Sequence, residues 1–342
     1  MSLIRDAIHV LAEKAPTPDP LARAAIGLLV ATQRRKLAHI PVHAERDFAR
    51  DMAERPIAEH TRAANEQHYE VPAAFFQACL GPRLKYSSCL YRTGKETLAD
   101  AEEIALTETC EHAKLEDGQH ILELGCGWGS LSLWMAQHYR NARITAVSNS
   151  ASQRAFINAR ACELGVTNLT VITCDMNDFS IDQTFDRIVS VEMFEHMANW
   201  RGLLERTRAW LKPEGRLFLH VFSHVAAPYR FEVTDKNDWI AQHFFTGGVM
   251  PSHNLIRGFS DLYAVEQDWR WSGAHYERTA LQWLENFDAR QHVIWPALVE
   301  TYGADAKLWK RRWRLFFLAT AGLFGDRRGA EWGVSHHLLK PA

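Results

Sequence analysis

The chain of 342 residues is long enough for roughly two domains of average size. Hydrophobic residues make up 47% and charged residues 23% of it, which is typical of a globular protein and excludes a disordered, collagen-like or coiled-coil chain. Because 39 Lys and Arg residues face 41 Asp and Glu residues, the net charge of −2 provides no global field for holding nucleic acid, and any membrane contact must come from a local patch.

The cysteines favour neither a zinc site nor a disulfide framework. No two of them have the C-x2-C spacing of zinc ligands, and we expect no metal and only reduced thiols, as in a cytoplasmic protein: Cys79, Cys89, Cys110, Cys126, Cys162 and Cys174. The longest N-terminal apolar run, residues 24–31, is far shorter than the roughly 20 residues that span a membrane. Residues 1–20 also lack the core of a signal peptide.

Residues 1–115 are predicted to form an N-terminal helical segment that covers the ligand site. Arg34-Arg35-Lys36 closes an apolar stretch with the cations that favour a helix C-terminus. Thr97 and Asp100 form a capping pair, which predicts a helix that begins there and runs to about Leu115. The segment contains no strong strand pattern.

Residues 116–222 alternate between short apolar strands and helices. The strands are predicted at residues 119–124, 143–147, 169–173, 187–191 and 216–221. The helices are predicted at residues 130–139, 152–164 and 200–211. This alternation indicates βαβ units with right-handed crossovers, and therefore a doubly wound parallel sheet.

Residues 223–330 interrupt that alternation with aromatic, His-rich and amphipathic segments. We interpret them as a lid and substrate-binding region over the carboxyl ends of the strands, with a sixth strand at about 262–271. Residues 331–342 are predicted to return to the sheet edge, with a seventh strand at 332–339. The expected fold is therefore α/β, with a mostly parallel seven-stranded sheet, helices on both faces, an N-terminal helical segment and an inserted lid.

A glycine-rich loop follows the first predicted strand. Residues 123–129 read Glu-Leu-Gly-Cys-Gly-Trp-Gly and lead into a helix, where bare backbone and a helix N-terminus suit a close, negatively charged ligand group. The G-x-G-x-G spacing differs from the G-x-G-x-x-G of dinucleotide binders. Residues 148–150, Ser-Asn-Ser, stand where a dehydrogenase would carry its ribose-binding acid.

This loop resembles motif I of the S-adenosylmethionine-dependent methyltransferases, which implies a class I Rossmann-like fold. Five further segments narrow the resemblance: residues 86–91 (YSSCLY), 148–153 (SNSASQ), 192–197 (EMFEHM), 245–252 (FTGGVMPS) and 273–279 (GAHYERT). In this order they resemble the cyclopropane-fatty-acid-synthase-like methyltransferases over residues 65–342. Within that group the resemblance is closest to the coclaurine N-methyltransferase branch.

The resemblance implies a set of residues around S-adenosyl-L-methionine, whose product is S-adenosyl-L-homocysteine. The expected cofactor-binding residues are Tyr86, Ser87, Glu123, Gly125, Gly127, Asn149, Gln153, Asp175 and Met176. The glycines would pass the methionine part, and Asn149 and Gln153 would hold the ribose. Asp175 would accept a hydrogen bond from the adenine amino group beside Met176. Tyr86 and Ser87 would close over the cofactor carboxylate.

The reacting centre is predicted just after the fourth strand. Glu192 and Glu195 are three residues apart and would project to one side of a helical turn, at the sheet edge where ligands bind in open α/β folds. His196 adds a group whose ordinary pKa is close to neutrality. An amine must lose its proton before it can attack a methyl group, so these side chains suit the binding and deprotonation of an amine.

The two branches of the family differ at this motif. Cyclopropane synthases carry Gly-Met-Phe-Glu-His, whereas this chain has Glu192 and follows the Glu-x-Phe-Glu-His of the amine branch. Cyclopropane synthases also hold a bicarbonate, whose matching ligands here would be Glu195, His220 and Tyr276. The cysteine that binds bicarbonate in the cyclopropane synthases corresponds to Ser88 here, and this difference argues against a bicarbonate site. His220 and Tyr276 are therefore either catalytic groups or parts of the pocket wall.

The expected activity is N-methylation of a small aromatic or isoquinoline-like amine. The alternatives are cyclopropane-fatty-acyl-phospholipid synthesis or carbon methylation of an acyl chain, with bicarbonate, and a non-catalytic cofactor-binding protein. Residues 305–317 combine cations with aromatic side chains, a pattern that suits either a membrane surface or packing on the fold, and we favour packing. No nucleic acid is expected, and the oligomeric state, including a homodimer, stays open.

Overall fold

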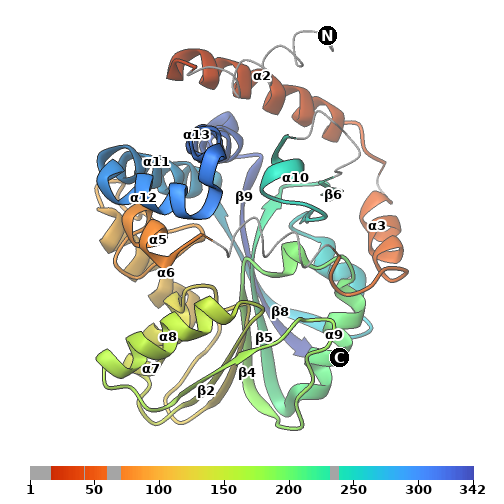
Figure 1. Cartoon of the computed structure of the whole chain (residues 1–342). Coiled ribbons are helices and arrows are strands. Elements are labelled where there is room, and N and C mark those ends of the chain that lie inside the picture. The colour runs from red at the N-terminus through yellow and green to blue at the C-terminus, as the bar shows by residue number, and fades with distance from the viewer. Residues whose placement is uncertain (1–16, 42, 60–70, 232–238) are drawn as a thin grey trace.

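The computed structural model describes residues 17–41, 43–59, 71–231 and 239–342. At its centre lies a seven-stranded sheet with the order β3-β2-β1-β4-β5-β9-β8 (Figure 1). Its strands are β1 (His120–Leu124), β2 (Arg143–Ser148), β3 (Leu169–Thr173), β4 (Phe185–Val191), β5 (Leu211–His224), β8 (Tyr263–Ser272) and β9 (Trp332–Pro341). The two strand pairs that β9 forms, with β5 and with β8, are antiparallel and the other four pairs are parallel, so the prediction of a mostly parallel seven-stranded sheet is confirmed.

Helices cover both faces of the sheet. One face carries α6 (Leu98–His112), α7 (Ser130–His138) and α8 (Ala151–Glu163), and the other carries α3 (Ala44–Met52) and α9 (Trp200–Trp210). Alternation along each strand separates the two cores: Ile121 packs with α6 and α7, whereas its neighbour Leu122 packs with α3 and α9. The sheet is therefore buried on both sides, as expected for parallel strands.

An upper layer covers the carboxyl ends of the strands (Figure 1). It consists of α2 (Asp19–Leu37), α5 (Ala73–Cys79), β6 (Tyr229–Arg230), α10 (Trp239–His243), β7 (Val249–Met250), α11 (Gly273–Ala289), α12 (Gln291–Tyr302) and α13 (Ala306–Phe324). Arg314 of α13 bonds to Asp19 at the start of α2 and to Asp288 of α11. Arg34 binds Asp326 at 2.5 Å, so both ends of α2 are fixed to other parts of this layer.

Several predicted boundaries are shifted for local reasons. Strand β5 begins at Leu211 rather than at 216, because Leu211 already pairs with Phe185 before the register shifts. The capping box of Thr97 and Asp100 is confirmed, although α6 ends at His112. The pairing of β6 with β7 was not predicted, since two-residue strands leave no periodic pattern.

Residues 1–115 are less uniformly helical than predicted. Between α5 and α6, residues 80–97 form turns and an irregular loop, and parts of the segment lie outside the described residues. Small 3-10 turns complete the fold: η1 (Phe194–His196), η2 (Leu255–Phe259), η3 (Gly303–Asp305) and η4 (Asp326–Arg328).

The junction between β8 and α11 yields a stability prediction. A Cβ on Gly273 would overlap the backbone carbonyl oxygens of Phe324 and Trp332, which cannot rotate away. We expect Gly273→Ala to lower the free energy of unfolding by about 1–3 kcal/mol, the usual cost of overpacking. Gly27→Ala is the matched control, because a Cβ there meets no atom within 4 Å and alanine favours a helix. Equal midpoints of denaturant unfolding for the two variants would contradict this packing.

Candidate active site

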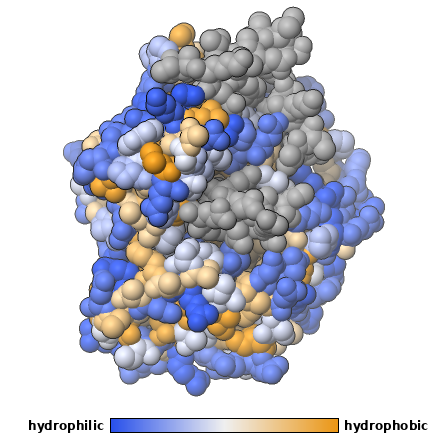
Figure 2. Space-filling model, in the orientation of Figure 1, coloured by the Kyte–Doolittle hydropathy of each residue, from blue (hydrophilic) through white to orange (hydrophobic). Residues whose placement is uncertain are grey.

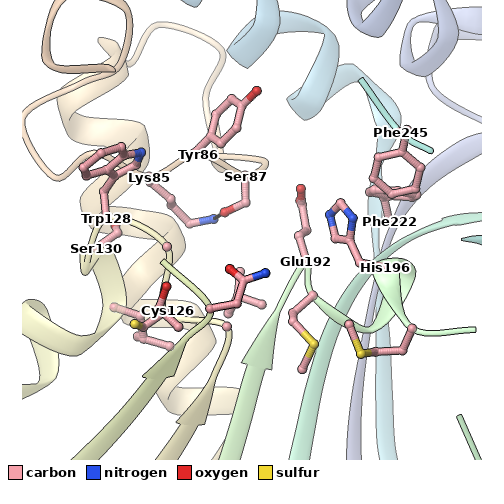
Figure 3. Close-up of a pocket in the computed structure, with 18 of the residues that line it drawn as sticks. Lys85, Tyr86, Ser87, Cys126, Trp128, Ser130, Glu192, His196, Phe222 and Phe245 are labelled. Carbon is pink, nitrogen blue, oxygen red and sulfur yellow. Dashed lines mark hydrogen bonds between the residues drawn. The ribbon is translucent and has the colours of Figure 1, made fainter. Parts of the chain in front are cut away.

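The ends of four parallel strands open into one cavity of about 240 Å³, far larger than a single water needs. Its floor comes from residues that directly follow β1, β2, β3 and β4, and its upper wall comes from α10, α11 and α13. This is the place predicted for a ligand in an open α/β sheet. Figure 3 shows side chains from both layers pointing into it.

The glycine loop forms one side of the floor. Gly125, Gly127 and Gly129 have φ angles of +82°, +51° and +81°, a backbone region that L side chains rarely adopt. A Cβ on Gly127 would meet no protein atom within 4 Å and would instead enter the cavity. Gly129 is the N-cap residue of α7, which begins at Ser130. The loop therefore brings bare backbone and a helix N-terminus to a ligand.

The next two strands contribute polar side chains to the same floor. Asn149, Gln153, Asp175 and Met176 all line the cavity. Gln153 is buried, and its Oε1 accepts a hydrogen bond of 2.7 Å from Ser148. Its Nε2 has no hydrogen-bond partner among the described residues, so a buried amide donor is left at the cavity. Such a donor is costly unless a ligand satisfies it.

Residues before α6 form the opposite wall, where Tyr86 and Ser87 line the cavity (Figure 3). Lys85, which was not predicted, lies beside them, 2% exposed, and its Nζ donates hydrogen bonds of 2.6 Å to Ser87 Oγ and Ser88 O. No local pattern distinguishes this lysine from a surface lysine. Burial raises the pKa of Glu123 to about 7, although the hydrogen bond that Ser132 donates to its carboxylate acts to lower it.

Glu192 lines the cavity and is contacted by several other segments of the chain. Its backbone has φ +48°, and its N–H donates to the carbonyl of His220 at 2.8 Å. On the carboxylate, Oε1 lies 2.9 Å from the Ser88 N–H and 3.2 Å from His220 Nε2, while Oε2 accepts a 2.6 Å hydrogen bond from the Tyr276 hydroxyl. Three segments far apart in the sequence therefore converge on one carboxylate.

Two opposing effects act on this carboxylate. Burial raises the pKa of Glu192 above its ordinary value, while the charge of Lys85 and the hydrogen bonds from Tyr276 and Ser88 lower it. Burial also lowers the pKa of His220 well below its ordinary value, so that this ring is neutral at pH 7. The site thus holds a carboxyl group that can change its protonation state closer to neutrality than an ordinary glutamate.

The second glutamate has a different environment. The helical turn η1 begins at Phe194, after Glu192, so the two carboxylates do not project together into the cavity. Glu195 is fully buried, and its Oε1 accepts a 2.6 Å hydrogen bond from the Phe222 N–H. Burial and the charge of Glu192 raise the pKa of Glu195 well above its ordinary value. This environment favours the protonated form of Glu195 more strongly than that of Glu192.

His196 does reach the cavity. Figure 3 shows its ring on the same side as Glu192, below Phe245. The ring centroids of His196 and Phe245 are 4.4 Å apart. Further apolar side chains complete this end of the cavity: Phe222, Phe231, Ile240, Met250, Trp283, Phe316, Leu323 and Phe324. A carboxylate and an imidazole thus face a largely aromatic wall.

The basic and aromatic segment 305–317 packs on the fold. Residues 306–317 form the first twelve residues of α13, where Trp313 and Phe317 are buried. Arg314 is held by the two aspartates already described. No helix in the described part of the chain is long and apolar enough to cross a membrane. The face in Figure 2 mixes hydrophilic and hydrophobic residues without one broad apolar area.

Comparison with known proteins places this geometry in a family. The sequence model of the family described as mycolic acid cyclopropane synthetase matches residues 58–329. (S)-Coclaurine N-methyltransferase of Thalictrum flavum subsp. glaucum is 37% identical over 289 residues, which cover 83% of this chain and 80% of that protein. Cyclopropane-fatty-acyl-phospholipid synthase of Escherichia coli (strain K12) is 33% identical over 273 residues, which cover 79% of this chain and 66% of that protein.

Solved structures agree with the sequence matches. A crystal structure of coclaurine N-methyltransferase bound to N-methylheliamine and SAH has a TM-score of 0.93 and 32% identity, and the match covers 99% of both chains. The cyclopropane synthase MmaA2 from Mycobacterium tuberculosis has a TM-score of 0.70 at 21% identity, covering 84% of this chain and all of that one, and shows the shared fold. This chain is therefore an S-adenosylmethionine-dependent methyltransferase that belongs to the mycolic acid cyclopropane synthetase family.

Proposed function

We propose that this protein transfers a methyl group from S-adenosylmethionine to the nitrogen of a small isoquinoline-like amine. Relatives named as N-methyltransferases, of coclaurine and of pavine, support this choice of acceptor. The observation that carries it is the position of the Glu192 carboxylate, which faces a cavity with a largely aromatic wall.

The floor of the cavity fits the cofactor. The open space in front of Gly127 and the unsatisfied Nε2 of Gln153 are what a closely bound ligand with hydroxyl groups requires. Asn149, Asp175 and Met176 extend the same floor, and Tyr86, Ser87 and Lys85 lie opposite. S-adenosylmethionine supplies an activated methyl group on a sulfonium. The protein's task is then to orient the acceptor and to remove its proton.

Glu192 stands in for the bicarbonate of the cyclopropane synthases. The resemblance assigned Glu195, His220, Tyr276 and the segment containing Ser88 to that ion. Here the Ser88 N–H, His220 Nε2 and the Tyr276 hydroxyl all contact the Glu192 carboxylate instead. A carboxylate has the shape and charge of bicarbonate, so these groups are already satisfied. This arrangement favours the amine branch over cyclopropane formation.

An amine substrate makes use of each part of this wall. A protonated amine is attracted by the charge of Glu192 and by aromatic faces such as those of Phe222 and Phe245. Its proton passes to a base, the nitrogen lone pair attacks the methyl carbon, and the sulfur–carbon bond breaks. Since the methylated product is itself an ammonium, one proton is released for each methyl group that the cofactor transfers to a substrate bound in its protonated form.

Among the three candidate bases, the structure favours Glu192 and His196. Both line the cavity, whereas Glu195 is enclosed, and burial and the charge of Glu192 raise its pKa well above the ordinary value. We assign proton removal to Glu192, with His196 beside the acceptor, and assign Glu195 the support of the adjacent β5 backbone through Phe222. All six cysteines are free, which agrees with our proposal that the protein acts in the cytoplasm.

The glycine loop provides a test of cofactor binding. We expect Gly127→Val to abolish binding of S-adenosylhomocysteine in calorimetry, because its side chain would occupy the space open to the ligand. Gly165→Val is the matched control, since Gly165 also has a positive φ, +65°, and open space but lies outside the cavity. Unchanged affinity in a folded Gly127→Val variant would overturn the proposed cofactor site.

Glu192→Gln tests the assignment of the base. The variant keeps the shape of the side chain but removes its charge. If Glu192 is the base, kcat/KM for an amine should fall by roughly 10²–10⁴-fold, the usual range for general-base catalysis. If it only anchors the cation, the loss should be smaller and mainly in KM. Glu163→Gln at the exposed end of α8 removes the same charge far from the cavity.

The pH profile of the wild-type enzyme follows from the same group. A base acts only when deprotonated, so the rate should fall as pH drops through the pKa of Glu192. Because burial raises this pKa, the fall should begin at a higher pH than for an ordinary glutamate. Full activity of Glu192→Gln over the whole pH range would leave the carboxylate without a role.

A lipid assay separates the two branches. We expect methylation of soluble amines and no cyclopropane in the lipids of an expressing host. We also expect little sedimentation with anionic vesicles, because the aromatic residues of α13 are packed. Mass spectrometry of lipid extracts and of amines incubated with labelled cofactor checks both points. Abundant cyclopropane acyl chains would favour the phospholipid reaction instead.

A further inference from the structure

Three histidines from three elements form a continuous line of hydrogen bonds that starts at Glu192. His220 Nε2 lies 3.2 Å from the Glu192 carboxylate, and His220 Nδ1 lies 2.8 Å from His336 Nε2. His336 Nδ1 in turn lies 2.8 Å from His112 Nδ1. We call His220, His336 and His112 the imidazole chain. The mechanism proposed above makes no use of its outer two members.

The sheet register places these rings together. His220 of β5 and Trp269 of β8 are the strand partners of His336 on β9. His112, in the last turn of α6, stacks on Trp269 with ring centroids 3.8 Å apart. His220 and His336 are fully buried, whereas the side chain of His112 is 15% exposed. The imidazole chain therefore extends from the cavity, through the protein, to a partly exposed end.

Such a chain of neutral rings has only two fully bonded states. A neutral imidazole has one N–H donor and one acceptor nitrogen, so the three rings donate either toward Glu192 or away from it. Burial lowers the pKa of both His220 and His336 well below the ordinary value, which keeps them neutral. The charged and titratable groups that face the chain are Lys85, Glu108, Glu111 and Glu192, and His337 on the opposite face of the strand acts on His336 only through its charge.

The two ends of the chain are unequal, and this selects one state. At the inner end, the Glu192 carboxylate accepts within hydrogen-bond range, and bonds to a charged acceptor are the stronger ones. At the outer end, His112 Nε2 is 3.9 Å from Glu108, which is too long for a hydrogen bond. Glu108 is already bonded by Trp271 and Arg92. Donation toward Glu192 is therefore favoured.

We propose that His336 and His112 are positioning residues that hold His220 as an Nε2–H donor to the Glu192 carboxylate and so keep this base ionised. The inference rests on the proposed role of Glu192. It requires no metal, and within the described part of the chain no three side chains of His, Cys, Asp or Glu converge as metal ligands would. Without the donor from His336, His220 is free to reverse its tautomer and face the carboxyl group with a lone pair.

The test compares two substitutions at His336. Phenylalanine cannot donate to His220, so we expect His336→Phe to raise the pKa of Glu192. The acid limb of kcat/KM should then move to higher pH by about one unit or more, with rates that converge with wild type at high pH. His336→Gln should restore most of the wild-type profile, because its amide can both donate and accept. The titration of the amine itself is the same for every variant.

His337→Phe is the matched control. His337 is the next residue on β9, is 2% exposed and points to the opposite face, so its replacement perturbs the same strand without cutting the chain. We expect its acid limb to stay at the wild-type position. If His336→Phe and His337→Phe shift the limb equally, or His336→Phe does not shift it, the positioning role is wrong.

A spectroscopic readout does not depend on turnover. Nitrogen-15 NMR of histidine-labelled protein reports the tautomer of each ring, and we expect Nε2–H for His220 and His336 and Nδ1–H for His112. Nδ1–H on His220 would overturn the inference. Failure of the proposed function looks different: Glu192→Gln would then retain the wild-type rate and acid limb. Failure of the positioning role alone leaves that variant impaired while His336→Phe keeps the wild-type limb.

Discussion

The structure is organised around a carboxylate that has been removed from water. Glu192 has a side chain that is only 7% exposed, and burial of an ion costs several kcal/mol even after the protein relaxes. The cost is offset by the Ser88 N–H, His220, Tyr276 and the charge of Lys85. These groups come from the loop before α6, from β5 and from α11. At this buried position the ionised form of Glu192 therefore depends on partners from both the core and the upper layer.

The chain reaches this position through an unfavourable backbone conformation. A φ of +48° at a glutamate costs of the order of 1–3 kcal/mol and persists only where the surroundings hold it. Here the Glu192 N–H bonds to β5, and its side chain has three hydrogen-bond partners. The turn points the carboxylate into the cavity while Glu195, three residues later, is enclosed against β5. Two residues of one type thereby acquire different surroundings, and the pKa of Glu195 is raised in part by the charge of Glu192.

The antiparallel strand β9 has a role beyond closing the sheet. Its insertion between β5 and β8 places His336 opposite both His220 and Trp269. The upper layer, in which Arg314 and Arg34 hold α2 in place, supplies Tyr276 to the carboxylate and the aromatic wall to the cavity. Strands β5 and β9 consequently supply the histidines that contact the Glu192 carboxylate, and the upper layer determines the shape of the acceptor site.

The sequence by itself determined the sheet, the glycine loop and the family. Continuous apolar runs such as residues 119–124 predict buried parallel strands, and the loop 123–129 has a local spacing that its backbone conformation requires. Strands β6 and β7 were missed because a strand of two residues has no detectable periodicity. Strand β5 begins before the predicted residue 216 because Leu211 already pairs with Phe185, ahead of a shift in register.

Only the tertiary structure decided which candidate residues meet. A three-residue spacing places Glu192 and Glu195 on one side only in a helix, and the turn starts too late for that. The partners of Glu192 lie at positions 85, 88, 220 and 276, and the imidazole chain at 112, 220 and 336. Residues in direct contact within these two groups are separated by up to 224 residues, and they share no local pattern. Their proximity depends on strand order and register, which form only when the whole sheet is built.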